Sequence, residues 1–188
     1  MADRFDVPDE AQMINECLPA LALVRMRNAK FKRPRPAGGK ITEIVLHDTD
    51  SGTTKYANTV NYLANPGDGR SVSIHYIIGR DAGEILAMVP EEMVANQARS
   101  HNDYSIGIEL WRNHKQYGYT AWQYDAVSQL VFDIRRRHGI PRDNVVGHGS
   151  FEKSRPPQEP EGFEWSRLDD DLDRLQARVK AFDPRFAL

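Results

Sequence analysis

The sequence has 188 residues, of which 40% are hydrophobic and 28% charged, and its formal net charge is -2 at pH 7. This composition is typical of one globular domain with a substantial core, and the near-neutral charge gives no reason to expect nucleic acid as a partner. The single cysteine excludes an internal disulfide, and no apolar run approaches the roughly 18 residues of a membrane span.

The first 40 residues differ from the rest of the chain. Residues 8–26 favour a helix broken near Pro19, and acids precede their apolar stretch, so we expect no signal peptide and synthesis in the cytoplasm. A basic stretch over residues 25–35 leads into prolines and glycines, which is typical of a linker. The alternative is a contact surface for an anionic polymer such as a cell wall. We therefore predict a helical extension and basic linker over residues 1–40, and one further domain over residues 41–188.

From residue 41 onward, patterns typical of strands and helices alternate. Apolar runs rich in β-branched residues predict strands that end at His47, Glu109 and His148. Residues 73–80 and 84–89 flank a turn and predict a hairpin. The domain is therefore predicted to be α/β, with a single mixed central sheet flanked by helices.

Three helices are predicted in this domain, each after a hydroxyl side chain that can cap it. They run from Thr53 or Thr54 to about Ala64, from Thr120 through residues 121–138 to a stop at Gly139, and from Ser166 to about Ala181.

His47, His148 and Glu109 are the residues whose chemistry points to a function. Strand ends in a mixed sheet open onto one edge, where imidazole is a natural zinc ligand and a carboxylate the usual general base. Each histidine alone is more readily interpreted as a hydrogen-bonded residue at a strand end, and the spacing contains no compact metal motif. The three together favour a metal-dependent hydrolase.

Four segments resemble the type-2 N-acetylmuramoyl-L-alanine amidases, the family that includes phage lysozyme-type amidases and peptidoglycan-recognition proteins. The segments are residues 44–49, 72–84, 102–109 and 146–165, in the order in which the family has them. The resemblance covers about two thirds of the chain. It implies an amidase-like catalytic domain from residue 41 onward, with the fold of that family.

The resemblance also implies a site and a reaction. Zinc would be held by His47 and His148 with a third, short-reach ligand, and Glu109 would take a proton from the attacking water and return it to the leaving amine. The bond cut would join muramic acid to the L-alanine of the stem peptide, in peptidoglycan or a soluble muropeptide. The family also has a histidine at the position of His75, which we interpret as structural.

The segment after His148 departs from the family pattern of a lysine followed by an aspartate or cysteine ligand. A gap-free alignment places Gln158 at the ligand position, whereas a shift of one residue places Glu159 there. Glu159 is favoured because a charged carboxylate binds zinc better than a neutral amide. Arg155 or Lys153 could replace the missing lysine as the cation that steadies the oxyanion.

Residues 95–99 stand where the family has a Trp-His pair, so we expect a different substrate groove. Four arginines are candidates for binding a carboxylate of the stem peptide, because the guanidinium group binds carboxylates bidentately. They are Arg70, Arg80, Arg99 and Arg112.

Two functions stay open. The first is an active zinc amidase, either a phage lysin (an endolysin of a bacteriophage) or a cytoplasmic recycling enzyme. The alternative is a muropeptide-binding module with an incomplete zinc site, which Gln158 at the ligand position would produce. Retention of Glu109 favours the enzyme, because a pure binder needs no base. A phage-tail component or an amidase of another substrate is not excluded, and nothing demands more than a monomer.

Overall fold

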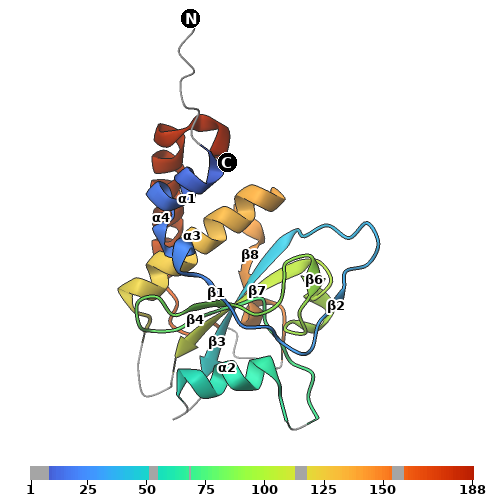
Figure 1. Ribbon diagram of the computed structural model, residues 1–188. Coiled ribbons are helices and arrows are strands. Elements are labelled where there is room, and N and C mark those ends of the chain that lie inside the picture. The colour runs from blue at the N-terminus through green and yellow to red at the C-terminus, as the bar shows by residue number, and fades with distance from the viewer. Residues whose placement is uncertain (1–8, 51–54, 68, 113–117, 154–158) are drawn as a thin grey trace, which may run out of the picture.

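The computed structural model describes residues 9–50, 55–67, 69–112, 118–153 and 159–188. Within these residues the centre of the fold is a six-stranded sheet in the order β1-β5-β4-β7-β3-β8, beside a two-stranded sheet of β2 and β6 (Figure 1). The strands are β1 (Arg25–Met26), β2 (Arg33–Pro34), β3 (Glu43–Asp50), β4 (Tyr76–Ile78), β5 (Ile85–Ala87), β6 (Met93–Val94), β7 (Ser105–Arg112) and β8 (Val145–Gly147). Among the described strands of the large sheet, only β4 and β5 pair antiparallel, so the predicted mixed sheet is confirmed.

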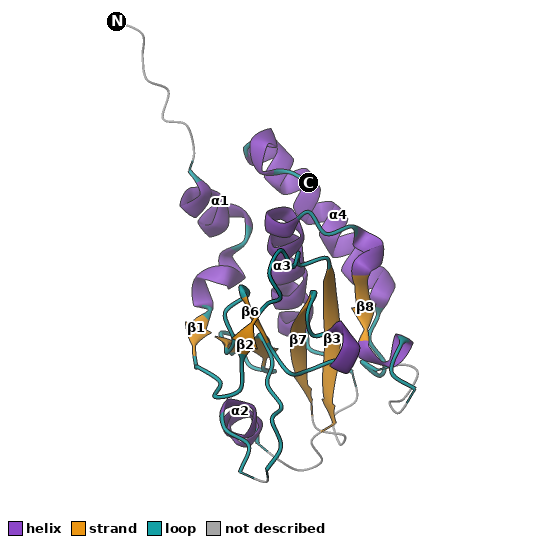
Figure 2. Ribbon diagram, turned by 90° about the vertical axis from the view of Figure 1, so that its right-hand side faces the viewer, coloured by secondary structure: helices purple, strands orange, loops and turns teal. Residues whose placement is uncertain are grey.

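Helices cover both faces of this sheet. Figure 1 and Figure 2 show α1, α3 and α4 together on one face and α2 on the other. The α-helices are α1 (Glu10–Cys17), α2 (Tyr56–Ala64), α3 (Ala121–His138) and α4 (Trp165–Phe182), and the short 3-10 helices are η1 (Pro19–Leu23), η2 (Arg99–His101), η3 (Arg142–Asn144), η4 (His148–Ser150) and η5 (Pro184–Phe186). No helix in the described ranges combines the length and apolarity needed to cross a bilayer.

Side chains along β3 and β7 point alternately to the two faces of the sheet and contribute to two separate apolar cores. Ile44 and Leu46 of β3 pack with Ile108 of β7 against α3 and α4 in the larger core. Trp111 of β7 packs against α2 in the smaller one. Because neighbouring side chains of a strand point to opposite faces, the residues between those of the larger core face α2. His47 and Glu109 belong to this second set.

Most helix predictions hold. Helix α3 has the predicted bounds, with Thr120 in a reciprocal capping box and Gly139 in the left-handed conformation at φ 67°. The chain also breaks at Pro19, where η1 begins. Helix α2 begins after Lys55, and the predicted caps Thr53 and Thr54 lie outside the described residues.

The predicted start of the last helix is wrong. Helix α4 begins at Trp165 after Glu164, so Ser166 lies inside its first turn and does not cap it. The backbone N–H of Glu164 donates to the hydroxyl of Tyr124 at 2.8 Å, and Phe163 stacks on the Tyr124 ring. These contacts with α3 set the helix start earlier than the local sequence indicates.

The basic stretch is tied into the fold. Its first residues form β1, which pairs parallel with β5, and Arg33 and Pro34 form β2. The guanidinium of Arg35 donates to the carbonyl oxygens of Glu91, Asp103 and Ser105 at 2.8–2.9 Å. A boundary at residue 40 stays a prediction, and much of the stretch before it is held by the sheets.

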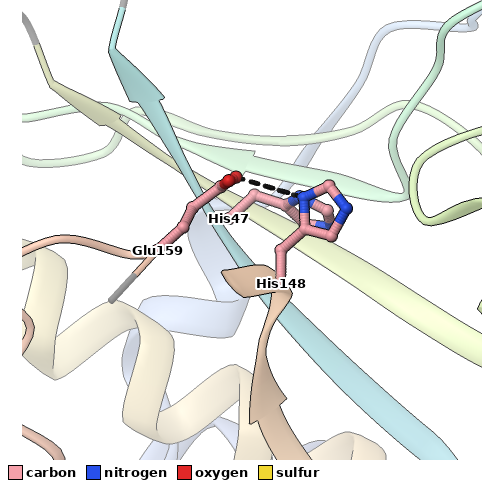
Figure 3. Close-up of side chains that lie close together, drawn as sticks. All are labelled: His47, His148 and Glu159. Atoms are coloured by element: carbon pink, nitrogen blue, oxygen red, sulfur yellow. Dashed lines mark hydrogen bonds and ion pairs between the residues drawn. The ribbon is translucent and has the colours of Figure 1, made fainter. Parts of the chain in front are cut away.

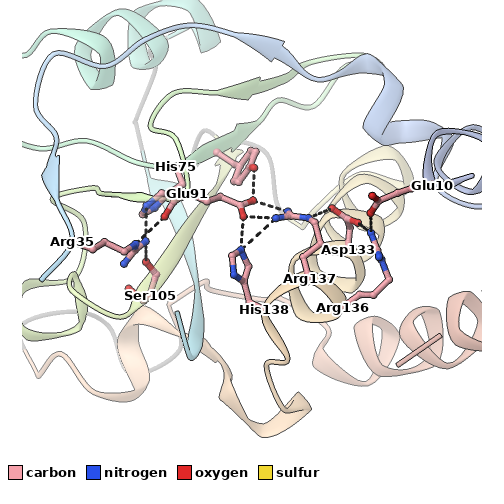
Figure 4. A network of polar contacts seen from close by, with 10 residues as sticks. Glu10, Arg35, His75, Glu91, Ser105, Asp133, Arg136, Arg137 and His138 are labelled. Atoms are coloured by element: carbon pink, nitrogen blue, oxygen red, sulfur yellow. Dashed lines mark hydrogen bonds and ion pairs between the residues drawn. The ribbon is translucent and has the colours of Figure 1, made fainter. Parts of the chain in front are cut away.

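Glu91 is the centre of a partly buried polar network that joins β4 to α3 (Figure 4). Its carboxylate accepts from Tyr76 at 2.6 Å, from Arg137 at 2.5 and 2.7 Å, and from His138 at 2.6 Å. Arg137 is also paired with Asp133 at 2.7 Å. Burial would raise the pKa of Glu91, but the donors from Arg137, His138 and Tyr76 hold it well below its usual range.

Glu91→Gln is expected to destabilise the protein at pH 7 by about 3 kcal/mol or less, the low end for a buried pair, because Arg137 is partly exposed. A depressed carboxyl pKa gives stability that is present above the unfolded value, about 4.3 for glutamate, and is lost as the pH falls toward the folded value. The difference between wild type and variant should therefore shrink from pH 7 to pH 3 in urea unfolding. The exposed neighbour Glu92→Gln is the control, and a constant difference would contradict the assignment.

Candidate metal centre

His47 and Glu109 are cross-strand neighbours. They lie opposite each other in the parallel register of β3 and β7. The prediction that these strands end at His47 and Glu109 is wrong, because residues 48–50 go on to pair with residues 110–112. Both side chains therefore project from the middle of a ladder onto the α2 face. Thr49, two positions after His47, shares that face.

The second histidine is delivered by β8. This strand pairs with β3 through Leu46 and Gly147, and it ends just before His148, as the sequence predicts. The rings of His47 and His148 lie with centroids 4.5 Å apart. A Cβ at Gly147 would lie 2.5 Å from the carbonyl oxygen of Glu159, so only glycine allows the later segment to pack this closely.

Glu159 completes a buried cluster with the two histidines, shown in Figure 3. Its Oε1 lies 3.2 Å from Nδ1 of His148 and 3.7 Å from Nδ1 of His47. Ligand atoms of the three residues all lie within 4.8 Å of one another. Zinc binds imidazole and carboxylate at about 2.0–2.2 Å in a tetrahedron, which places ligand atoms roughly 3.4 Å apart. The donor set and its spacing therefore fit a zinc ion.

The cluster holds Glu159 in its charged form. Burial would raise the pKa of this carboxyl, but the hydrogen bond from His148 and the nearby imidazole of His47 lower it to about 2. A deprotonated carboxylate is the form that binds metal.

Glu109 has the opposite electrostatics. Burial raises the pKa of its carboxyl, and the Glu159 and Asp48 carboxylates add to the effect, although His47 and a hydrogen bond from Thr49 oppose it. The hydroxyl of Thr49 donates to Oε1 of Glu109 and fixes that oxygen. A carboxyl with a raised pKa beside a metal centre can accept and return a proton near neutral pH.

A buried ion pair anchors the segment that carries Glu159. On the α3 face, Arg112 Nε donates to both oxygens of Asp48 at 2.9–3.0 Å. Asp48 in turn accepts from the backbone N–H of Glu161 at 3.2 Å, and the Tyr119 hydroxyl donates to the Glu161 carbonyl at 3.3 Å. These bonds tie the chain to β3 and β7 two residues after Glu159.

A groove of about 370 Å³ opens beside the cluster. It is lined by His47, Glu109 and Glu159 together with Tyr62, Arg70, Asn96 and Gln97. Among the four candidate arginines, only Arg70 lines this groove. Arg112 pairs with Asp48, Arg80 donates to the Gly118 carbonyl, and Arg99 pairs with Glu152 at 3.1 Å.

The structure brings together four of the predicted site residues, namely His47, His148, Glu109 and Glu159, and their roles stay predictions. Lys153 is exposed. Arg155 and Gln158 lie outside the described residues.

His75 has a structural place in the fold. It is fully buried, accepts from the backbone N–H of Gly107 at 3.0 Å and donates to the carbonyl of Met93 at 3.2 Å. Burial lowers its pKa to about 4, so the ring is neutral. Both nitrogens are used by the backbone, in keeping with the structural interpretation.

Comparison with known proteins decides the family. Residues 37–160 match the family described as N-acetylmuramoyl-L-alanine amidase. The chain belongs to this family. A curated relative, N-acetylmuramoyl-L-alanine amidase A of Achromobacter lyticus, is 30% identical over 105 residues. That match covers 55% of the chain and 56% of the relative, so it spans little more than half of either protein.

Several solved structures share the fold. A selenomethionine derivative of AmpD superposes with a TM-score of 0.72 at 24% identity, covering 81% of this chain and 96% of that one. PlyL gives 0.63 at 20% identity, covering 79% and 96%. The Staphylococcus aureus hydrolase AmiA, in complex with its ligand, gives 0.66 at 16% identity, covering 90% and 91%. The predicted fold class and family resemblance are confirmed.

Proposed function

We propose that the protein is a zinc-dependent amidase that hydrolyses the bond between N-acetylmuramic acid and L-alanine in peptidoglycan or muropeptides, and that it acts as a monomer. His47, His148 and Glu159 would hold the zinc ion. The observation that carries the proposal is the buried grouping of these three residues directly beside Glu109. Membership of the amidase family supplies the substrate class.

The placement of Glu109 beside His47 supports a role for it as the acid–base group of the proposed reaction. A bound zinc ion would polarise the amide carbonyl and lower the pKa of the attacking water. Glu109 takes a proton from that water as the water oxygen bonds to the lactyl carbonyl carbon. When the carbon–nitrogen bond breaks, Glu109 returns the proton to the amine of L-alanine. The raised pKa of Glu109 suits both transfers.

Two further contacts are part of the proposal. Arg155 or Lys153 would supply the cation that steadies the oxyanion, in place of the lysine usual in the family. Arg70, at the wall of the groove, would bind a carboxylate of the stem peptide.

The test compares zinc-loaded protein with chelator-treated protein on two substrates, purified peptidoglycan and a soluble muropeptide. We expect stem peptides beginning with L-alanine in the mass spectrum, and none after chelation. Cleavage of intact peptidoglycan would favour a lysin, whereas cleavage of the soluble fragment alone would favour a recycling enzyme. Intact substrates that co-sediment or co-elute with the protein would instead support a binding module.

A further inference from the structure

Gln97 contacts the cluster of His47, His148 and Glu159 through the His47 ring, on the side of that ring away from Glu159. Its Oε1 is hydrogen-bonded to Nε2 of His47, the ring nitrogen that does not face Glu159. Its Nε2 donates to Oγ of Ser105 on β7 at 2.7 Å. One amide thus bridges the start of β7 to the first histidine.

The Ser105 hydroxyl fixes the direction of both hydrogen bonds made by the Gln97 amide. The Ser105 hydroxyl donates its one proton to the carbonyl of His101 at 2.6 Å, so toward Gln97 it can only accept. The amide nitrogen of Gln97 must therefore face Ser105, and its oxygen must face His47. An amide oxygen only accepts, so Nε2 of His47 carries a proton. In the neutral ring, Nδ1 is then the nitrogen with a free lone pair, and it lies 3.7 Å from Oε1 of Glu159.

The backbone fixes Gln97 in this place. Asn102 Oδ1 accepts from the N–H of Gln97 at 2.9 Å and from that of Ala98 at 2.6 Å. On the face of the sheet that carries His47, a Cβ at Gly107 would come within 2.8 Å of the amide carbon of Gln97. The glycine therefore leaves the space in which the amide lies.

We propose that Gln97 is a positioning residue that holds His47 in the Nε2–H tautomer and turns its Nδ1 toward the metal. The inference rests on the proposed zinc site and deepens it. Metal-binding histidines commonly donate their second ring N–H to an oxygen acceptor, which sets the tautomer and the ring orientation. In this chain the acceptor is a neutral amide from the segment where the family has a Trp-His pair.

The first test measures zinc affinity of the full chain by competition with a chromophoric chelator. Gln97→Met removes the acceptor at similar volume and is expected to weaken zinc binding by roughly 10–100-fold. Gln97→Glu keeps an oxygen facing His47 and should retain most of the affinity. The matched control is Gln129→Met, which removes a buried amide of α3 bonded to the Ala20 N–H at 2.8 Å. It should lower the melting temperature without changing zinc affinity.

The second test uses nitrogen-15 NMR of the metal-free protein, so it does not depend on zinc. We expect wild-type His47 to carry its proton on Nε2 and the Gln97→Met variant to populate both tautomers. An Nδ1–H tautomer in wild type, or unchanged zinc affinity in folded Gln97→Met, would overturn the inference. A wild type that shows the expected tautomer but binds no zinc would overturn the proposed function instead.

Discussion

Replacing Glu109 with glutamine is expected to slow amide cleavage by roughly 10²–10⁴-fold, the usual contribution of a positioned acid–base group, without loss of zinc. Glutamine fills the same space beside His47 and can still meet the Thr49 hydroxyl, but it cannot accept a proton from water. The measurement is the rate of stem-peptide release from a muropeptide, with zinc content determined on the same samples.

Two comparisons sharpen this result. Asp103→Asn changes an exposed carboxylate just before β7 and is expected to leave the rate unchanged. Thr49→Val removes the donor to Glu109 and should give a smaller loss than Glu109→Gln. If Glu109→Gln cleaved at the wild-type rate, another group would have to transfer the proton. If wild type and Glu109→Gln both failed to cleave the muropeptide but bound it equally well, a muropeptide-binding module would be the better account.

Elements that depend on local pattern were predictable from the sequence. The apolar stripe, Thr120 and Gly139 define α3 within the helix itself, and the turn between residues 80 and 84 defines the hairpin. The histidines and Glu109 could be chosen because each stands in or beside an apolar strand, a poor place for a polar side chain without a partner.

Pairing between distant strands was not predictable in the same way. That His47 and Glu109 are direct neighbours depends on the register of β3 against β7, which no local pattern encodes. Thr49 could have been found, since a residue two positions from His47 lies on the same face. Gln97 marked a departure from the family, but its contact with His47 is purely tertiary.

The contacts of the basic stretch over residues 25–35 could not be predicted from its composition either. Its charge and its prolines are typical of a solvated linker, yet Arg35 is held by carbonyl groups of residues 91, 103 and 105. The composition of a segment shows which side chains it contains, whereas the carbonyl partners of the half-buried Arg35 guanidinium come from elsewhere in the chain.

Glu159→Ala removes one of the three proposed zinc ligands. It is therefore expected to lower zinc affinity by more than the roughly 10–100-fold that is typical when a residue hydrogen-bonded to a ligand is lost. Amide cleavage should fall with zinc occupancy. Glu159→Asp keeps the carboxylate but shortens its reach by one methylene, so it should keep part of the affinity. Zinc affinity by chelator competition and cleavage by mass spectrometry are measured on each variant.

The matched control is Glu161→Ala. Glu161 lies two residues later on the same segment, but its side chain is 66% exposed and contacts Arg112 at 3.2 Å. Its backbone N–H still donates to Asp48, so the anchor of the segment is kept. Loss of a nearby surface charge should leave zinc affinity close to that of wild type. Equal losses in Glu161→Ala and Glu159→Ala would point to disturbance of the segment instead of loss of a ligand.

Gln158→Ala decides between the two alignments that the sequence leaves open. If Glu159 is the ligand, Gln158→Ala binds zinc as wild type does, and the change at Glu159 alone removes the metal. The reverse pattern would place Gln158 at the ligand position and favour a muropeptide-binding module. The structure favours the first outcome, because Oε1 of Glu159 faces Nδ1 of both histidines and Gly147 leaves room for its backbone beside β8. A carboxylate held charged between two imidazoles costs desolvation energy, and a bound cation offsets that cost.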